Sequence, residues 1–235
     1  MKQLLILGAG TAGTTMASHL RKKLRKNEWK ITIVDERKEH YYQPGFLFVP
    51  FGIYTPKQTV KPIKKFIPKG VELLQESIEL VKPEENKVIL ANGSHLLYDI
   101  MIIATGSDIA PEEVEGMKGA EWQKSVFDFY SYEGSVALAE KLKNWEGGNL
   151  VVHITEMPIK CPVAPLEFAF LADAYFKKKN MRHKVEITYV TPLSGPFTKP
   201  KCNLELSHLL KDKNINTVND FAIMEVDNDN KKIVD

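Results

Sequence analysis

The sequence lacks the features that several classes of protein need. It has only two cysteines in 235 residues, too few for a disulfide framework, so a cysteine with a function would be redox-active or catalytic. No apolar run approaches the roughly 20 residues that cross a bilayer, and the first strand-like segment follows Met1 directly, without a signal peptide. The formal net charge of +2 is too small to favour nucleic acid as a partner. We therefore expect a cytoplasmic protein.

Metal chemistry is also not indicated. None of the six histidines has the spacing of a metal-ligand motif, so no metal site is predicted and all six are interpreted as structural or exposed.

The informative stretch lies at the start of the chain. Residues 4–7 form an unbroken apolar run, typical of a strand buried on both faces of a parallel sheet. Gly8, Gly10 and Gly13 then supply a G-x-G-x-x-G pattern where a helix of about residues 12–26 should begin. In this pattern the first glycine permits a tight turn, the second lets a pyrophosphate approach, and the third lets helix and strand pack closely. The helix N-terminus would hold the phosphates.

An acidic residue completes this pattern. A second β-rich run, residues 31–34, ends in Asp35, where a βαβ unit places the carboxylate that accepts ribose hydroxyls. The alternative is a surface aspartate at a strand end, and the complete order of elements favours the dinucleotide site. The basic residues that end the first helix, from Arg21 to Lys26, are expected to be a solvated helix end, with attraction to anionic lipid as the lesser alternative.

The segment of residues 36–52 is rich in aromatic residues and proline, and it should lie at the carboxyl edge of the sheet. Its aromatic side chains either cap a core or form the wall of a flat cofactor ring, and the position favours the cofactor. A strand at 71–74 and a β-meander over 77–98 follow, and then a buried strand at 100–104. This strand ends in Ala104-Thr105-Gly106, where small residues let the backbone pass near a ligand.

The second half predicts another Rossmann-like unit. A helix at 132–145 precedes a buried strand at 149–154, a helix at 166–179 and a strand at 185–191. A helix at 204–213 and a β-hairpin at 221–234 close the chain. The expected fold is therefore α/β, with a Rossmann-like FAD-binding domain over residues 1–110 that carries the β-meander insertion. An incomplete, degenerate NAD-type Rossmann-like unit over residues 111–235 follows it.

A cysteine stands where a second phosphate loop is expected. The loop of residues 155–165 contains three prolines and no glycine, so it does not favour close approach of a pyrophosphate. Cys161 lies in it just ahead of a helix N-terminus and next to Lys160, and both features favour the thiolate form. Most cysteines are small buried hydrophobes. Cys161 stands where a phosphate loop is expected, and this position favours a redox or catalytic role for its thiol. Cys202 is interpreted as structural.

With GAGTAG, Asp35, HYYQPGF, ATG and MPIKCPVAPLEFAF in hand, the sequence resembles the sulfide:quinone oxidoreductases. These are flavoproteins with two dinucleotide-binding domains, similar to the type II NADH dehydrogenases. The resemblance covers the N-terminal half to two-thirds of the family's length. It implies FAD on the first unit, with the pyrophosphate at Gly8, Ala9, Gly10, Thr11, Ala12 and Gly13 and the ribose at Asp35. Tyr42, Gln43 and Pro44 would lie near the flavin or its phosphates, and Ala104, Thr105 and Gly106 behind it.

The same resemblance implies the reaction. Cys161 would be one of two redox cysteines flanking the flavin, with Glu167 in the same catalytic segment; sulfide would be oxidised and a quinone from the membrane reduced. The second redox cysteine, a later flavin motif and the membrane-binding helices of the family are not found among these residues. We therefore expect the isolated chain to be inactive and only a longer form to be a peripheral membrane protein; the possibility of a homo-oligomer stays open. The alternatives are a type II NADH:quinone oxidoreductase, which the glycine-free loop disfavours, and a non-catalytic FAD-binding fragment.

Overall fold

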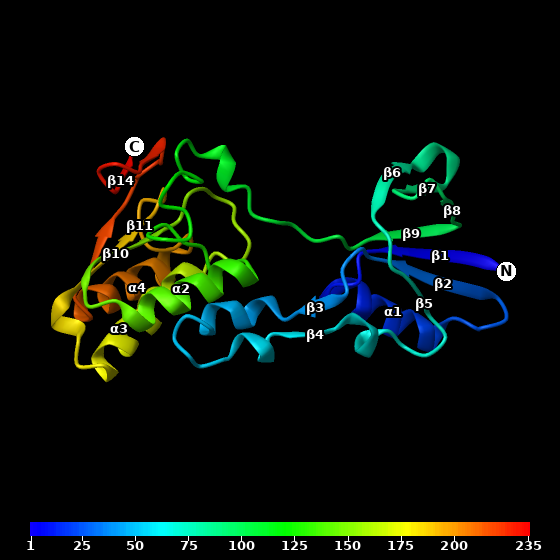
Figure 1. The fold of residues 1–235 in the computed structure, drawn as a ribbon, viewed down its shortest axis with the longest axis horizontal. Coiled ribbons are helices and arrows are strands. Elements are labelled where there is room, and N and C mark those ends of the chain that lie inside the picture. Colours follow the sequence, from blue (N-terminus) through cyan, green and yellow to red (C-terminus); the bar gives the residue numbers. More distant parts are fainter. The chain divides into compact units, whose positions relative to one another are not determined.

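The chain forms two compact units. The computed structural model describes residues 1–235, with Met1–Gln43 and Thr55–Asp108 in the first unit and Pro44–Tyr54 and Ile109–Asp235 in the second (Figure 1). The later crossing, at Ile109, lies beside the expected boundary at residue 110. The segment Pro44–Tyr54, which the sequence analysis assigned to the first domain, belongs instead to the second unit.

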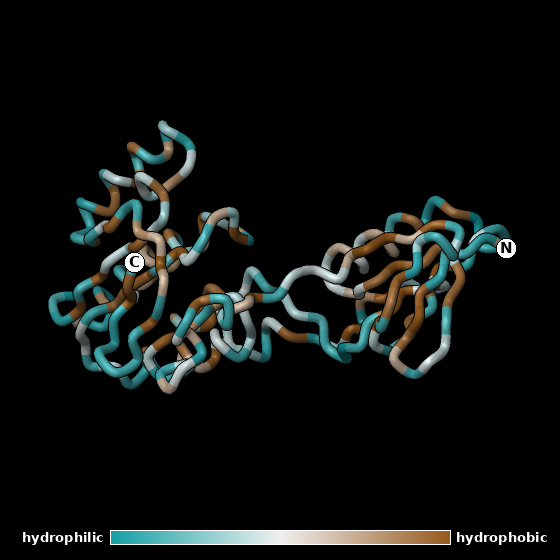
Figure 2. The backbone as a smooth tube through the Cα atoms, turned by 90° about the horizontal axis from the view of Figure 1, so that it is seen from above, coloured by the Kyte–Doolittle hydropathy of each residue, from teal (hydrophilic) through white to brown (hydrophobic).

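The first unit is built on a parallel sheet of order β5-β2-β1-β9. Strand β1 (Lys2–Leu7) pairs with β2 (Trp29–Val34) and with β9 (Ile100–Ile103), while β5 (Glu72–Leu74) extends the sheet beyond β2. Helix α1 (Thr11–Lys23) connects β1 to β2 and covers one face of the sheet through Ala17. Figure 2 shows the strands of this unit as largely hydrophobic segments next to the N-terminus. Both faces of β1 are buried, as its continuous apolar run predicts.

The other face of this sheet is covered by the predicted β-meander. Strands β6 (Ile78–Lys82), β7 (Lys87–Leu90) and β8 (His95–Leu97) pair antiparallel, and Val88 and Leu90 of β7 pack against Leu5 and Leu7 of β1. A further antiparallel pair, β3 (Glu39–Tyr41) with β4 (Val60–Pro62), was not predicted, because three residues are too few to show a period.

The second unit contains a parallel sheet of order β10-β11-β12. Its strands are β10 (Gly148–His153), β11 (Val185–Val190) and β12 (Ile215–Val218), and its helices are α2 (Tyr132–Asn144), α3 (Ala164–Lys178) and α4 (Pro200–Asp212). Strand β12 was not predicted, and α4 begins four residues earlier than expected, at Pro200, which is typical of the first turn of a helix. Short 3-10 helices lie at Gln43–Phe48, Pro56–Gln58, Ile63–Phe66, Pro83–Glu85, Pro111–Glu113 and Arg182–Lys184.

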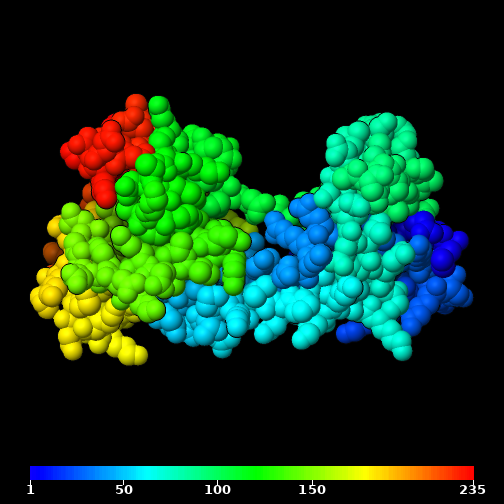
Figure 3. All heavy atoms as spheres, in the orientation of Figure 1, coloured from blue at the N-terminus to red at the C-terminus, as the bar shows by residue number.

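The predicted C-terminal hairpin is confirmed. Strands β13 (Glu225–Asp227) and β14 (Lys232–Val234) pair antiparallel, and Figure 3 shows this red segment against green residues of the same unit. The Val226 N–H donates to the Glu115 carbonyl at 2.8 Å, and the Asn228 amide donates to the Gly116 carbonyl at 2.8 Å. No helix in the chain is both long enough and apolar enough to span a bilayer.

Two strands that were expected to be buried are edge strands. Ile103 in β9 is 66% exposed and Val151 in β10 is 47% exposed, because each strand has a neighbour on one side only. The apolar runs predicted the strands correctly but could not show which of them end the sheet.

Aromatic residues of the 36–52 segment belong to a core. Phe46 is buried, and Phe51 lies 4.9 Å from Phe168 of α3, ring centre to ring centre, within the hydrophobic core of the second unit. The preference for a cofactor wall was therefore wrong for these phenylalanines, and the ordinary structural role of aromatic side chains holds.

Arg21 is not a solvated helix end. It is buried, and its guanidinium donates to the carbonyls of Leu24 at 2.6 Å and Trp29 at 3.2 Å. Leu24 is the C-cap residue of α1 and Trp29 is the first residue of β2, so both carbonyls lie beyond the last turn of the helix. The arginine therefore joins the end of α1 to the start of β2.

Candidate functional site

The turn between β1 and α1 is tightly packed at two of its three glycines. Gly8 has φ +95°, and a Cβ there would lie 2.3 Å from the Ala104 carbonyl oxygen. A Cβ on Gly13 would lie 1.8 Å from the Gly8 carbonyl oxygen. Both distances are far below contact, so the fold itself requires glycine at these two positions.

Gly10 is different, because nothing lies within 4 Å of the position of its Cβ. It is the N-cap residue of α1 in an extended conformation, no side chain caps the helix, and the first turn contains no acidic residue. Gly10, Thr11 and Ala12 are all exposed. The N–H groups and the positive end of α1 therefore face open space, which suits an anionic group such as a pyrophosphate.

Asp35 is held beside this turn. One carboxylate oxygen accepts the Ala9 N–H at 2.7 Å and the other accepts the Arg37 N–H at 2.8 Å. The structure thus brings together the acid and the glycine turn, which the sequence pattern placed at one edge of the sheet. The carboxylate is half-buried and keeps free acceptor capacity for ribose hydroxyls.

The other residues predicted to contact the cofactor lie either at the carboxyl edge of the first sheet or where the chain crosses between the two units. Ala104 is half-buried and follows β9 against the glycine turn, while Thr105 and Gly106 are exposed. Tyr42 is 51% exposed, and its N–H donates to the Thr59 carbonyl at 2.7 Å. Between Gln43 and Pro44 the chain passes from the first unit to the second.

In the second unit, Cys161 lies on the loop between β10 and α3, at the carboxyl edge of the parallel sheet. It is a free, exposed thiol, as is Cys202 in the first turn of α4. The Cys161 backbone has φ +56°, which is uncommon for a residue with a side chain. Its carbonyl accepts the Ala164 N–H at 3.0 Å, so the residue leads into the start of α3.

A tyrosine that the sequence analysis did not identify lies at this cysteine. The Tyr130 hydroxyl donates to the Cys161 carbonyl at 3.2 Å. Burial raises the pKa of Tyr130, and the negative charges of a Cys161 thiolate and of Glu167 raise this pKa further. Tyr130 and Cys161 are therefore in direct contact, and the exposed Glu167 lies in the first turn of the helix that follows. No sequence signal links Tyr130 to Cys161, although Ser131 after it is a recognisable helix N-cap.

His153 ends β10 at the same edge of the sheet. Burial lowers the pKa of His153 to about 4, so the imidazole is neutral near neutral pH. Its ring packs edge-on against Phe221 at 5.6 Å, and its Nε2 is buried without a hydrogen-bond partner. This agrees with the interpretation of His153 as structural.

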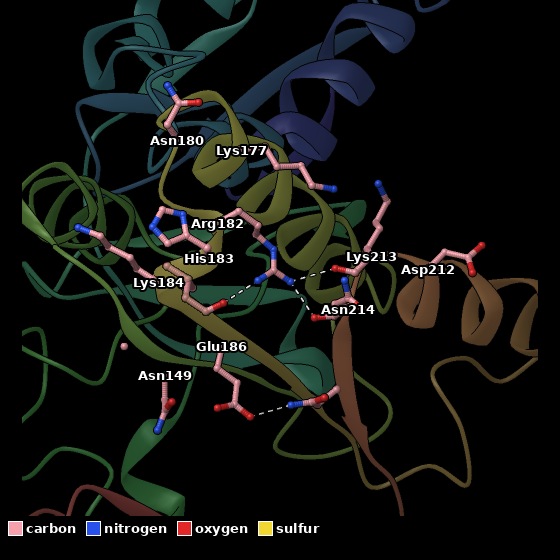
Figure 4. Close-up of a pocket in the computed structure, with 13 residues that line it drawn as sticks. Asn149, Lys177, Asn180, Arg182, His183, Lys184, Glu186, Asp212, Lys213 and Asn214 are labelled. Carbon is pink, nitrogen blue, oxygen red and sulfur yellow. Dashed lines mark hydrogen bonds between the residues drawn. The ribbon is translucent and has the colours of Figure 1, made fainter.

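A hollow of the second unit lies at the opposite, amino edge of the sheet (Figure 4). Three of its basic side chains, those of Lys177, Arg182 and Lys213, pair with the carboxylate of Asp173. The Arg182 guanidinium donates to the carbonyls of Val185, Lys213 and Asn214 at 2.6, 2.9 and 2.7 Å, and to the buried carboxylate of Asp173. Because ligands of parallel α/β sheets bind at the carboxyl edge, we place the candidate site at Cys161 and not in this hollow.

Comparisons with known proteins identify the family. Residues 2–153 match the profile described as pyridine nucleotide-disulphide oxidoreductase. The chain belongs to this family. It is 31% identical over 233 residues to the mitochondrial sulfide:quinone oxidoreductase of Dictyostelium discoideum, across 99% of this chain and 51% of that protein. A type II NADH:quinone oxidoreductase of Staphylococcus haemolyticus is 28% identical over 123 residues, 52% of this chain and 30% of that protein.

A solved structure supports the fold of this family member. The X-ray structure of the sulfide:quinone oxidoreductase of Aquifex aeolicus superposes with a TM-score of 0.81 at 23% identity, over 97% of this chain and 53% of that one. The comparisons confirm the resemblance stated from the sequence. They confirm also the α/β fold, with its Rossmann-like unit, small antiparallel insertion and second parallel sheet. The chain spans about half the length of the sulfide:quinone oxidoreductases that it matches.

Proposed function

We propose that this protein is a FAD-dependent oxidoreductase that oxidises sulfide, to polysulfide or sulfur, and passes the electrons to a quinone. The observation that carries the proposal is Cys161. It is an exposed thiol on a proline-rich, glycine-free loop at the carboxyl edge of the second sheet, where an NADH-binding unit would carry a phosphate turn. The likeness to a sulfide:quinone oxidoreductase over nearly the whole chain supports the same assignment.

In this proposal the first unit binds the cofactor. The open N-terminus of α1, from Gly10 to Gly13, holds the pyrophosphate, and Asp35 holds the ribose. The remaining cofactor contacts are Gly8, Ala9, Tyr42, Gln43, Pro44, Ala104, Thr105 and Gly106. Bound FAD supplies the capacity to accept two electrons and pass them on.

The second unit supplies the thiol chemistry. The Cys161 thiolate is the nucleophile, because the ionised sulfur and not the thiol reacts. Glu167, in the first turn of the helix that follows the Cys161 loop, is proposed to hold or accept a proton. Tyr130 stays protonated, since its pKa is raised, and so remains a hydrogen-bond donor to the Cys161 carbonyl.

The quinone is proposed to come from the membrane, to which a longer form of this cytoplasmic protein would bind peripherally. A second candidate is a type II NADH:quinone oxidoreductase, favoured by relatives of that class that match 52% of the chain. A third is a FAD-binding fragment without activity. Reduction by NADH distinguishes the second, and bound flavin without any reduction distinguishes the third.

Replacing the thiol tests the proposal. In a form of the protein that spans the full length of its relatives, Cys161→Ser should lower sulfide-dependent quinone reduction by about a thousandfold or more, since serine is barely ionised near neutral pH. Flavin content should stay unchanged. Cys202→Ser, at the other exposed thiol, is the matched control and should keep its activity. Near-normal turnover of Cys161→Ser, or fast flavin reduction by NADH, would contradict the proposed function.

A further inference from the structure

The start of helix α2 is held by one carboxylate. Asp128 accepts the N–H groups of Tyr130 at 3.0 Å and Ser131 at 2.7 Å through one oxygen. The other oxygen accepts the Ser131 hydroxyl at 3.0 Å and the Gln123 amide at 3.1 Å. Four donors on one carboxylate leave Tyr130 little freedom of its backbone.

Glycine is required beside this carboxylate. A Cβ on Gly134, in the first turn of α2, would lie 2.2 Å from an Asp128 carboxylate oxygen. The Gly134 N–H meanwhile donates to the Ser131 hydroxyl at 3.0 Å, which caps α2. The Asp128 carboxylate is therefore held in one place at the start of α2 by its hydrogen bonds and by its close contact with Gly134.

From this anchor two aromatic residues reach the cysteine loop and α3. The Phe129 ring stacks on Phe168 of α3, with ring centres 4.6 Å apart and planes 13° apart. The next residue, Tyr130, places its hydroxyl on the Cys161 carbonyl. The same carbonyl accepts the Ala164 N–H. Two donors, one from the residue before α2 and one from the start of α3, therefore hold the Cys161 carbonyl group.

Fixing this peptide group matters because of its conformation. Cys161 has φ +56°, a left-handed conformation that a residue with a side chain leaves for negative φ unless its surroundings hold it. A change in the sign of φ redirects the Cα–Cβ bond and with it the sulfur. The contact from Tyr130 therefore bears on where the thiol points.

We propose that Tyr130, anchored by Asp128, is a positioning residue that holds Cys161 in its left-handed conformation and so keeps the thiol in one orientation. That this orientation serves sulfide oxidation rests on the proposed function. The positioning itself does not, and it can be measured on the chain without cofactor or substrate.

The test attaches a nitroxide spin label to Cys161 in a Cys202→Ser background, so that one exposed thiol is labelled. Electron paramagnetic resonance then reports how firmly the labelled loop is held. In Tyr130→Phe we expect the ratio of immobilised to mobile label to fall by roughly fivefold, the factor that one ordinary hydrogen bond supplies. Asp128→Asn keeps the Tyr130 hydroxyl but weakens its anchor, and it should give a smaller change in the same direction.

Tyr175→Phe is the matched control, since it removes a tyrosine hydroxyl that donates to another carbonyl of this unit, that of Leu142, at 3.3 Å. It should leave the spectrum unchanged. An unchanged spectrum in Tyr130→Phe, or an equal change in Tyr175→Phe, would overturn the positioning role. If a form of the protein that spans the full length of its relatives binds flavin but does not oxidise sulfide, the proposed function is refuted. The positioning result is then unaffected.

Discussion

At the scale of single residues, the structure separates glycines that the fold requires from one that a ligand would require. Gly8 and Gly13 are confined by backbone atoms of the same unit, whereas Gly10 faces open space. The sequence pattern predicted all three positions, because the G-x-G-x-x-G spacing combines both requirements. Substitution at Gly13 should therefore lower the stability of the fold, whereas substitution at Gly10 should leave that stability nearly unchanged.

Gly13→Ala should destabilise the first unit. Its Cβ would lie 1.8 Å from the Gly8 carbonyl oxygen, so α1 must move away from β1. We expect the free energy of unfolding in urea to fall by about 3 kcal/mol or more. Gly10→Ser, at an exposed N-cap position that serine favours, should stay within about 0.5 kcal/mol of the unsubstituted chain. Equal stabilities of the two variants would show that the close contact at Gly13 is relieved at no cost.

The residues around Cys161 show where sequence prediction ended. The glycine-free loop and the nearby helix start predicted Cys161 as a candidate, and the resemblance to the sulfide:quinone oxidoreductases implied Glu167. The left-handed backbone of Cys161 and its contact with Tyr130 depend on a residue that is distant in the sequence, and no local pattern encodes such a contact. Whether these residues carry the chemistry stays a prediction.

At the scale of elements, the sequence predicted most strands of both sheets but missed β3, β4 and β12. Strands β1 and β2 and the β-meander were predicted from periodicity, as were helices α2 and α3. The pair β3–β4 and strand β12 were missed, because these segments show no clear apolar alternation: Glu39–Tyr41 and Val60–Pro62 hold mostly polar residues and a proline, and Ile215–Val218 is largely exposed. Arg21 was predicted to be solvated, because composition does not show which side chain of a basic helix end is buried.

A buried carboxylate joins several elements of the second unit. Asp173 of α3 is only 1% exposed, and it is paired with Lys177 and Arg182 at 2.9 Å each and with Lys213 at 3.5 Å. Burial alone would raise the pKa of Asp173, but hydrogen bonds from Lys177 and Arg182 and the charge of Lys213 outweigh it. The net pKa is therefore lowered. The ionised carboxylate thus ties the end of α3 to the starts of β11 and β12.

Removing this charge should have a pH-dependent cost. Because the folded-state pKa lies below the ordinary value of 3.8, the carboxylate stabilises the fold above that pH and loses this effect as the pH falls further. Asp173→Asn should lower the free energy of unfolding by about 3 kcal/mol near neutral pH, since it leaves the largely buried Arg182 without its carboxylate. The difference from the unsubstituted chain should shrink in acid, at about pH 3.

Urea unfolding at both pH values measures this effect. Asp212→Asn, an exposed carboxylate at the same edge of the sheet, is the control and should stay within about 0.5 kcal/mol of the unsubstituted chain. A cost for Asp173→Asn that is the same in acid as near neutral pH would show that the stabilisation does not come from the ionised carboxylate.

At the scale of the whole molecule, the sequence predicted the fold class, but it did not predict that Pro44–Tyr54 belongs to the second unit. Its aromatic residues indicated burial or a ligand, and only the three-dimensional packing on α3 decides which. The chain spans about half the length of its relatives, so the activity proposed here concerns a form that includes the other half.

The central claim is that the open N-terminus of α1 is a binding site for the pyrophosphate of FAD. A titration of the purified chain with FAD, followed by quenching of flavin fluorescence, tests it most directly. The account predicts saturable binding of one FAD per chain. In Gly10→Val, whose side chain would occupy the path of the pyrophosphate, binding should be lost. The stability of this variant without FAD should change by less than about 1 kcal/mol. No saturable binding to the unsubstituted chain, or undiminished binding to Gly10→Val, would contradict the account.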